Sequence, residues 1–122
     1  MSIFIKPVIY IQVHAGHVSA RRIGGGSVRK DCVALTHPRT LMGDFAAIEA
    51  CFQAVVRELI AGALIAFKPV LVVHLIPEVT GGYTNVEERA FQEAAAGAGA
   101  RSCVVISGRP PLSDAQVAEA VR

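Results

Sequence analysis

Three histidines are the residues of this chain that could most readily do chemistry. His14 and His17 flank a short Ala-Gly break between two apolar-rich runs, and His74 lies within a later run, Val70–Ile76. If the run that ends at His14 and the run Val70–Ile76 are neighbouring parallel strands, the three imidazoles meet near one end of a sheet and could ligate zinc. The alternative is that His74 is a hydrogen-bonded core residue. The second interpretation is favoured, and no metal or other cofactor is predicted.

Other residue types that could support catalysis are sparse. Cys32, Cys51 and Cys103 form an odd set without C-x-x-C spacing, which predicts small core residues rather than disulfides or metal ligands. A two-metal nuclease needs carboxylates on its strands, and Asp31 is the only one in the first predicted strands. The sequence therefore does not favour a carboxylate-based active site.

The composition is typical of one domain covering residues 1–122. Hydrophobic residues make up 52% of the 122 residues and charged residues 18%, which is enough to bury a core. The net charge of +2 does not argue for a nucleic-acid partner. No apolar run approaches the roughly 20 residues that span a bilayer, and Met1 to Pro7 is too short for a signal peptide. A cytoplasmic protein is expected.

The first third of the chain predicts three strands that pair as antiparallel hairpins. They are expected at Val8–His14, Val18–Ile23 and Val28–Leu35, with a glycine turn at residues 24–26 between the last two. Asp44 can then cap a helix, because its carboxylate accepts from free amides of the first turn. Apolar residues recurring at steps of three and four predict its buried face: Phe45, Ile48, Phe52, Val55, Leu59 and Ala63.

The rest of the chain predicts strands that alternate with helices. Val70–Ile76 and Ser102–Ser107 are nearly continuous apolar runs, as expected for strands buried on both faces. The order β-β-β-α-β-α-β-α with right-handed crossovers predicts an α/β fold. We expect a mixed five-stranded sheet in the order 3-2-1-4-5, which is the ribonuclease-H-like or actin-like half-domain.

Two capping boxes are predicted for the later helices. Asn85 with Glu88 fits the start of the helix that precedes the last strand. Ser113 with Gln116 fits the start of a short final helix that reaches Val121.

Two stretches carry a resemblance to a known family. "HPRTLMGDFAAIEACF" (residues 37–52) resembles a stretch that reads like "RPMKDGVIADFxxTExML" in the MreB family of bacterial actins. "AFKPVLVVHLIPEVTGGYTNVEERAFQEAAAGAGARSCVVI" (residues 66–106) resembles the family's "LFKPRVVIxVPxGxTxVERRAxxEAAxxAGAREVxLI". Residues 8–35 fit only by pattern. The resemblance covers subdomain IA alone, leaves no room for subdomain IB, and implies an actin-like domain linked to cell shape.

The resemblance also implies that the family's first phosphate loop has been replaced. The family reads D-x-G-T at the opening hairpin, whereas this chain reads His14-Ala15-Gly16-His17. Magnesium prefers hard oxygen ligands, which imidazoles do not supply. Glu87 falls where the family has its water-positioning glutamate; the alternative is a first-turn acid favoured by the helix dipole. We expect a degenerate phosphate loop at His14, Gly16 and His17, and no ATP hydrolysis.

One segment implies a membrane contact. Bacterial actins use apolar residues in the loop that "ALIAFKP" resembles, so Leu64, Ile65 and Phe67 are candidates for dipping into an anionic bilayer. The alternative is that these side chains cover the bottom of the core. Co-sedimentation with anionic liposomes of the wild type and of a variant that carries both Ile65→Ser and Phe67→Ser tests the hypothesis. Equal pelleting of the two proteins, or pelleting of neither, would end it.

A basic hairpin surrounds the triple glycine and consists of Arg21, Arg22, Arg29 and Lys30. These charges could bind acidic lipid, nucleic acid or an acidic partner. The alternative, which is favoured, is that they keep a sheet edge from pairing with other chains. No nucleic-acid partner is therefore expected.

Two hypotheses of different classes follow. The first is a non-catalytic, bacterial-actin-like interaction module linked to cell shape, cytoskeleton or envelope assembly, cytoplasmic or peripheral on the inner face of the cell membrane. It would bind itself or a protein partner, with the carboxyl end of the sheet and the helix at Ser113–Val121 as the expected surface. The second is a degenerate nucleotide- or metal-dependent enzyme whose site a partner chain completes. The replaced phosphate loop favours the first.

Overall fold

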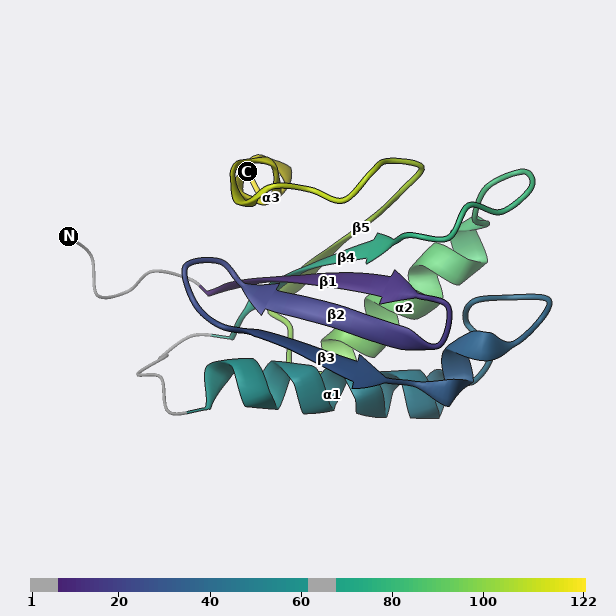
Figure 1. Ribbon diagram of the computed structural model, residues 1–122, viewed down its shortest axis with the longest axis horizontal. Coiled ribbons are helices and arrows are strands. Elements are labelled where there is room, and N and C mark those ends of the chain that lie inside the picture. Colours follow the sequence, from purple (N-terminus) through teal and green to yellow (C-terminus); the bar gives the residue numbers. More distant parts are fainter. Residues whose placement is uncertain (1–6, 62–67) are drawn as a thin grey trace.

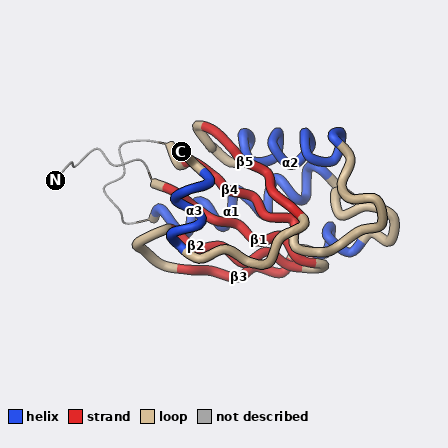
Figure 2. Tube along the Cα trace, turned by 90° about the horizontal axis from the view of Figure 1, so that it is seen from above, coloured by secondary structure: helices blue, strands red, loops and turns tan. Residues whose placement is uncertain are grey.

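The structure is a computed structural model that describes residues 7–61 and 68–122. Five strands form one mixed sheet in the order β3-β2-β1-β4-β5, which confirms the predicted order (Figures 1 and 2). Strands β1, β2 and β3 are antiparallel neighbours, whereas β1, β4 and β5 run parallel. The bounds are β1 Val8–His14, β2 His17–Arg22, β3 Ser27–Asp31, β4 Val70–Leu75 and β5 Ser102–Ser107.

Three α-helices cover the two faces of the sheet unequally (Figure 1). α1 (Phe45–Ile60) and α2 (Asn85–Gly97) lie on one face. The much shorter α3 (Asp114–Ala120) lies on the other face. One face is therefore broadly covered, and the other only in part.

The larger apolar core lies between the sheet and the layer of α1 and α2. Side chains alternate along a strand, so Ile9, Ile11 and Val13 of β1 all point into this core. Phe52 of α1 and Phe91 of α2 meet there with ring centroids 6.3 Å apart. A smaller cluster on the opposite face contains Tyr10, Val72, Leu112 and Val117. α3 thus closes a second, smaller core.

The third strand is shorter than the predicted Val28–Leu35. β3 ends at Asp31 because the Cys32 amide donates to the Gly16 carbonyl at 2.8 Å and the Leu35 amide donates to the Cys32 carbonyl at 3.0 Å. These bonds turn the chain into a short 3-10 helix, η1 (Val33–Thr36). The prediction was wrong here because apolar content alone does not show where a strand leaves its neighbour.

The predicted cap of α2 was wrong by one residue. The Thr84 hydroxyl accepts from the Glu87 amide, and the Glu87 carboxylate accepts from the Thr84 amide, which makes the capping box Thr84–Glu87 rather than Asn85–Glu88. Thr84 has the extended backbone of a cap, whereas Asn85 is already helical. The Ser113–Gln116 box of α3 is confirmed.

The buried face of the first helix, α1, differs from the prediction at both ends. The Asp44 side chain caps α1 by accepting from the Ala47 amide, as predicted. Phe45 is 40% exposed, however, and the buried face begins at Ile48. α1 ends at Ile60 because the next residue is extended, and Ala63 lies outside the described residues.

Phe52 and Phe45 give a matched pair of tests on α1. Phe52 is fully buried, whereas Phe45 is 40% exposed. Replacing Phe52 with Ala should lower the free energy of unfolding by about 3–5 kcal/mol, because buried contacts are lost and a cavity remains. Phe45→Ala should cost less than about 1 kcal/mol. Urea unfolding of both variants measures the two values, and equal losses would contradict the place of Phe52 in the core.

Candidate functional site

The turn between β1 and β2 is bonded to the chain that follows β3. Gly16 has a φ of +84°, a left-handed conformation in which a side chain would be strained. Its amide donates to the Leu35 carbonyl at 3.2 Å, and its carbonyl accepts from the Cys32 amide at 2.8 Å. A phosphate-binding turn presents its amides to phosphate oxygens. In this chain the Gly16 amide is already bonded inside the protein.

His14 and His17 face each other across this turn. They are paired in the β1–β2 ladder, and their rings stack with centroids 4.4 Å apart and planes 6° apart. Nε2 of His14 donates to Oε1 of Gln12 at 3.0 Å. Burial, followed by the charges of His17 and Arg29, lowers the pKa of His14 from its ordinary 6.5. The turn therefore presents a neutral imidazole ring rather than a carboxylate.

His74 is fully buried at the centre of a hydrogen-bond relay. Its Nε2 donates to the Arg109 carbonyl at 3.0 Å, which leaves Nδ1 to accept from the Tyr10 hydroxyl at 2.6 Å. The Leu112 amide donates to the same Tyr10 oxygen at 3.0 Å. Burial lowers the pKa of His74, against the raising effect of its bond to Arg109. A neutral His74 thus ties β4 to β1 and to the segment that leads into α3.

The three histidines do not assemble into a metal site. Both ring nitrogens of His74 are engaged, and its partner in the β1–β4 ladder is Gln12 rather than His14. Across residues 7–61 and 68–122, no group of three histidine, cysteine or acidic side chains could hold a metal ion. His74 has the geometry of a hydrogen-bonded core histidine.

Arg21 forms a second tie between the sheet and α3, which sequence analysis missed. Its Nε donates to Oδ1 of Asp114 at 2.8 Å, and another nitrogen of its guanidinium donates to the Leu112 carbonyl at 2.7 Å. The guanidinium carbon also lies 4.7 Å from the centroid of the Tyr10 ring. α3 therefore lies over the amino-terminal half of β1, not at the carboxyl end of the sheet where an association surface was expected. The available signal was a tyrosine and a histidine in apolar strands, since buried polar tips need partners.

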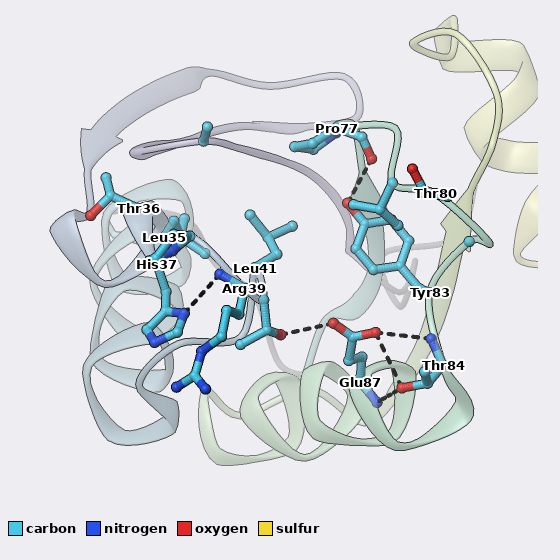
Figure 3. Close-up of a pocket in the computed structure, with 15 residues that line it drawn as sticks. Leu35, Thr36, His37, Arg39, Leu41, Pro77, Thr80, Tyr83, Thr84 and Glu87 are labelled. Carbon is cyan, nitrogen blue, oxygen red and sulfur yellow. Dashed lines mark hydrogen bonds between the residues drawn. The ribbon is translucent and has the colours of Figure 1, made fainter.

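A cleft of about 400 Å³ lies at the carboxyl edge of the sheet (Figure 3). It opens between the β1–β2 turn, the segment 35–41 and the loop that follows β4. Its polar groups bond largely to one another. The Tyr83 hydroxyl donates to the Pro77 carbonyl at 2.6 Å, and the Thr40 hydroxyl donates to the Glu87 carboxylate at 2.8 Å. These bonds engage Tyr83, Thr40 and Glu87, whereas among the described residues the Arg39 guanidinium and the Thr80 hydroxyl form no hydrogen bond or ion pair.

Glu87 lines this cleft and forms the capping box of α2 together with the cap residue Thr84 (Figure 3). Its Oε1 accepts from the Thr84 amide at 2.9 Å and from the Thr84 hydroxyl at 3.1 Å, while Oε2 accepts from Thr40. The Thr84 amide and then the Thr40 hydroxyl lower the pKa of Glu87. A general base works best with a pKa near the operating pH. Glu87 is instead held ionised and oriented toward the helix start.

The four residues of the predicted basic hairpin are divided between surfaces. Arg21 pairs with Asp114 of α3, and Arg29 lies 3.9 Å from Asp31. Neighbouring residues of a strand point to opposite faces, so Arg22 and Lys30 are directed away from Arg21 and Arg29. The strands therefore do not gather the four charges into one patch.

The predicted membrane contact falls on Leu64, Ile65 and Phe67, which lie outside the described residues. Within the described ranges, none of the helices combines the length and apolar character that crossing a bilayer requires. The contact through residues 64–67 stays a sequence prediction.

The three cysteines are free thiols in or against the larger core. Burial, and then the neighbouring Cys51, raises the pKa of Cys32 to about 12. Burial also raises the pKa of Cys103 to about 12. Thiols of such high pKa stay protonated at neutral pH, which makes them poor nucleophiles and metal ligands.

Comparisons with known proteins identify the fold. Neither a scan against protein-family models nor a search of curated proteins finds a match. Among solved structures, the chain is similar to MreB 5 of Spiroplasma citri bound to AMPPNP, with a TM-score of 0.56 and 13% identity over 84% of this chain. The fold is that of an MreB actin-like domain. The chain spans 38% of the length of MreB 5, and at this identity the similarity shows the fold alone.

Acid should destabilise the protein through its two neutral histidines. Folding lowers the pKa of His14 and His74 below the ordinary 6.5, so just below pH 6.5 the unfolded chain binds more protons than the folded one. The stabilisation is fully present above that pH, falls as pH decreases, and levels off below the folded-state pKa values. The lowered pKa of Glu87 affects the free energy of unfolding only below about pH 4.5, the ordinary pKa of the group, and so outside the pH range in which the histidines titrate.

Urea unfolding from about pH 7.5 to about pH 5 measures this loss. A His14→Gln variant should show a shallower dependence, with the remainder due to His74. A flat profile for the wild type would contradict the assigned neutral states.

Proposed function

We propose that this chain is a non-catalytic protein-interaction module built on an actin-like domain. The observation that carries the proposal is the β1–β2 turn. The Gly16 amide donates inside the protein, and the imidazoles of His14 and His17 stand where the resembling family has a carboxylate and a hydroxyl. Phosphoryl transfer depends on positioning and charge stabilisation around the nucleotide. The turn offers little of either, which supports a role in binding rather than catalysis.

The bonding of Glu87 supports the same proposal. Water activation requires a carboxylate that is free to take a proton, whereas both oxygens of Glu87 accept hydrogen bonds from Thr84 and Thr40. Those bonds serve the start of α2 and the segment that precedes α1. Glu87 therefore has a structural use that does not depend on a bound nucleotide.

We place the module in a bacterial-actin-like setting: cell shape, cytoskeleton or envelope assembly on the cytoplasmic side of the membrane, with peripheral contact through residues 64–67. The similarity of fold to MreB 5 and the stretches that resemble the MreB family support this setting. The module would act by associating with itself or with a protein partner. A degenerate nucleotide- or metal-dependent enzyme completed by a partner chain is the alternative, and ligand binding distinguishes the two.

Titration calorimetry with Mg-ATP, and separately with zinc, tests the absence of an enzymatic site. We expect no saturable heat with either ligand, because the turn lacks the carboxylate and a free glycine amide. Micromolar affinity for Mg-ATP, about −8 kcal/mol, would overturn the proposal. A Thr84→Ala variant should lose about 0.5–2 kcal/mol of unfolding free energy, because it removes the cap hydroxyl that accepts from the Glu87 amide.

Sedimentation velocity over a wide range of concentrations tests the binding role. The partly covered sheet face and the unpaired edge of β5 lead us to expect a larger species as concentration rises. A strictly monomeric protein at every concentration would contradict self-association.

A further inference from the structure

Among the described residues, β5 is an edge strand whose outer side has no strand neighbour. It lies at the end of the sheet beside β4 (Figure 2). Because it pairs on one side alone, half of its backbone N–H and C=O groups are directed away from the sheet. The strand Ser102–Ser107 carries no charged residue, and Cys103, Val104, Val105 and Ile106 are all only partly buried. An apolar, uncharged edge of this kind is a template for pairing with another strand.

The other edge of the sheet is protected. β3 carries Arg29, Lys30 and Asp31 in succession, and all three are exposed. Charges on an edge strand discourage pairing with another chain. The β3 edge therefore resists pairing with a further strand, whereas the β5 edge lacks this protection.

Two hollows flank β5 at its two ends. One, of about 280 Å³, adjoins the start of the strand and includes Arg101 with the small side chains Ala96 and Ala100. The other, of about 220 Å³, adjoins the end of the strand and includes Ser107, Gly108 and the exposed Glu78. Each hollow contains residues of α2 or of the loop before it. The hollow at the start of β5 carries the positive charge of Arg101, and the hollow at its end carries the negative charge of Glu78.

We propose that β5 pairs with β5 of a second copy of this chain, in antiparallel fashion about a two-fold axis near Val104 and Val105. The inference rests on the proposed function, because it names the surface by which the module associates with itself. Antiparallel pairing places the start of one β5 beside the end of the other. Arg101 of each copy then lies beside Glu78 of the other copy. The dimer therefore contains two such ion pairs, one at each end of the paired strands.

The remaining charges at the edge fit this arrangement. Arg109 also follows β5, but its carbonyl accepts from His74 on the α3 face of the sheet. Across residues 7–61 and 68–122, neither Arg101 nor Glu78 forms an ion pair within one copy. Both are therefore free to pair across the axis, and the product is one continuous ten-stranded sheet.

Edge variants measured by sedimentation equilibrium test the proposal. Val104 is half-buried but packs in neither apolar cluster, so Val104→Glu should fold while placing two carboxylates near the axis. We expect the dimer dissociation constant to rise at least tenfold. Ser27→Glu is the control, since it adds the same carboxylate at an exposed position of the other edge strand, β3. Its dissociation constant should stay at the wild-type value. Far-UV circular dichroism verifies the fold of each variant.

Charge reversal supplies a second test that leaves the strand intact. Arg101→Glu and Glu78→Arg should each weaken the dimer, and the double variant should recover most of the wild-type affinity. Absence of recovery, an effect of Ser27→Glu equal to that of Val104→Glu, or a wild type that stays monomeric would overturn the β5 pairing. A wild-type dimer that is insensitive to all β5 variants would overturn this surface while leaving the interaction module standing.

Discussion

Gly16 adopts a left-handed conformation, and the loops at one edge of the sheet depend on the two hydrogen bonds that this conformation allows. Its carbonyl and amide bind Cys32 and Leu35, which ends β3 and starts η1. The chain then runs to Thr40, whose hydroxyl bonds Glu87 at the cap of α2. Ligands of open α/β sheets generally bind at the carboxyl ends of the strands. In this chain, much of the hydrogen-bonding capacity there is used to hold loops together.

The opposite face of the sheet depends on a different set of bonds. Tyr10 and His74 hold the segment before α3, and Arg21 holds both that segment and Asp114. This arrangement places α3 over β1 and leaves the edge of β5 unpaired. The same connection that closes the small core therefore carries the chain away from the outer side of β5, the surface at which we propose that two copies associate.

The fold was predictable from the sequence because its signals are local and consistent. Alternating or continuous apolar runs place the strands, Asp44 and Ser113 cap helices as predicted, and the order of elements allows few sheet topologies. The end of β3 was not predictable, because it depends on bonds to Gly16 in a distant turn. The choice between Thr84 and Asn85 failed because both are good caps, and only the backbone distinguishes them.

The sequence predicts which residues lie at the candidate site, but it does not predict the hydrogen bonds that they form. The sequence places His14, His17 and Glu87 near one edge, yet it does not show that the Gly16 amide is occupied or that Glu87 accepts from Thr40. The relay through Tyr10 could have been anticipated, since Tyr10 and His74 lie on one face of neighbouring strands. The pairing of Arg21 with Asp114 could not, because 93 residues separate them and no local pattern links them.

The central claim is that the β1–β2 turn is a structural turn and not a phosphate loop, and the amide of Gly16 reports on it directly. Amide hydrogen exchange followed by NMR, with and without millimolar Mg-AMPPNP, measures whether this amide is bonded inside the protein. The account predicts slow exchange in the free protein, and neither a shift nor added protection with nucleotide. Fast exchange in the free protein, with protection and a saturable shift on adding nucleotide, would contradict it.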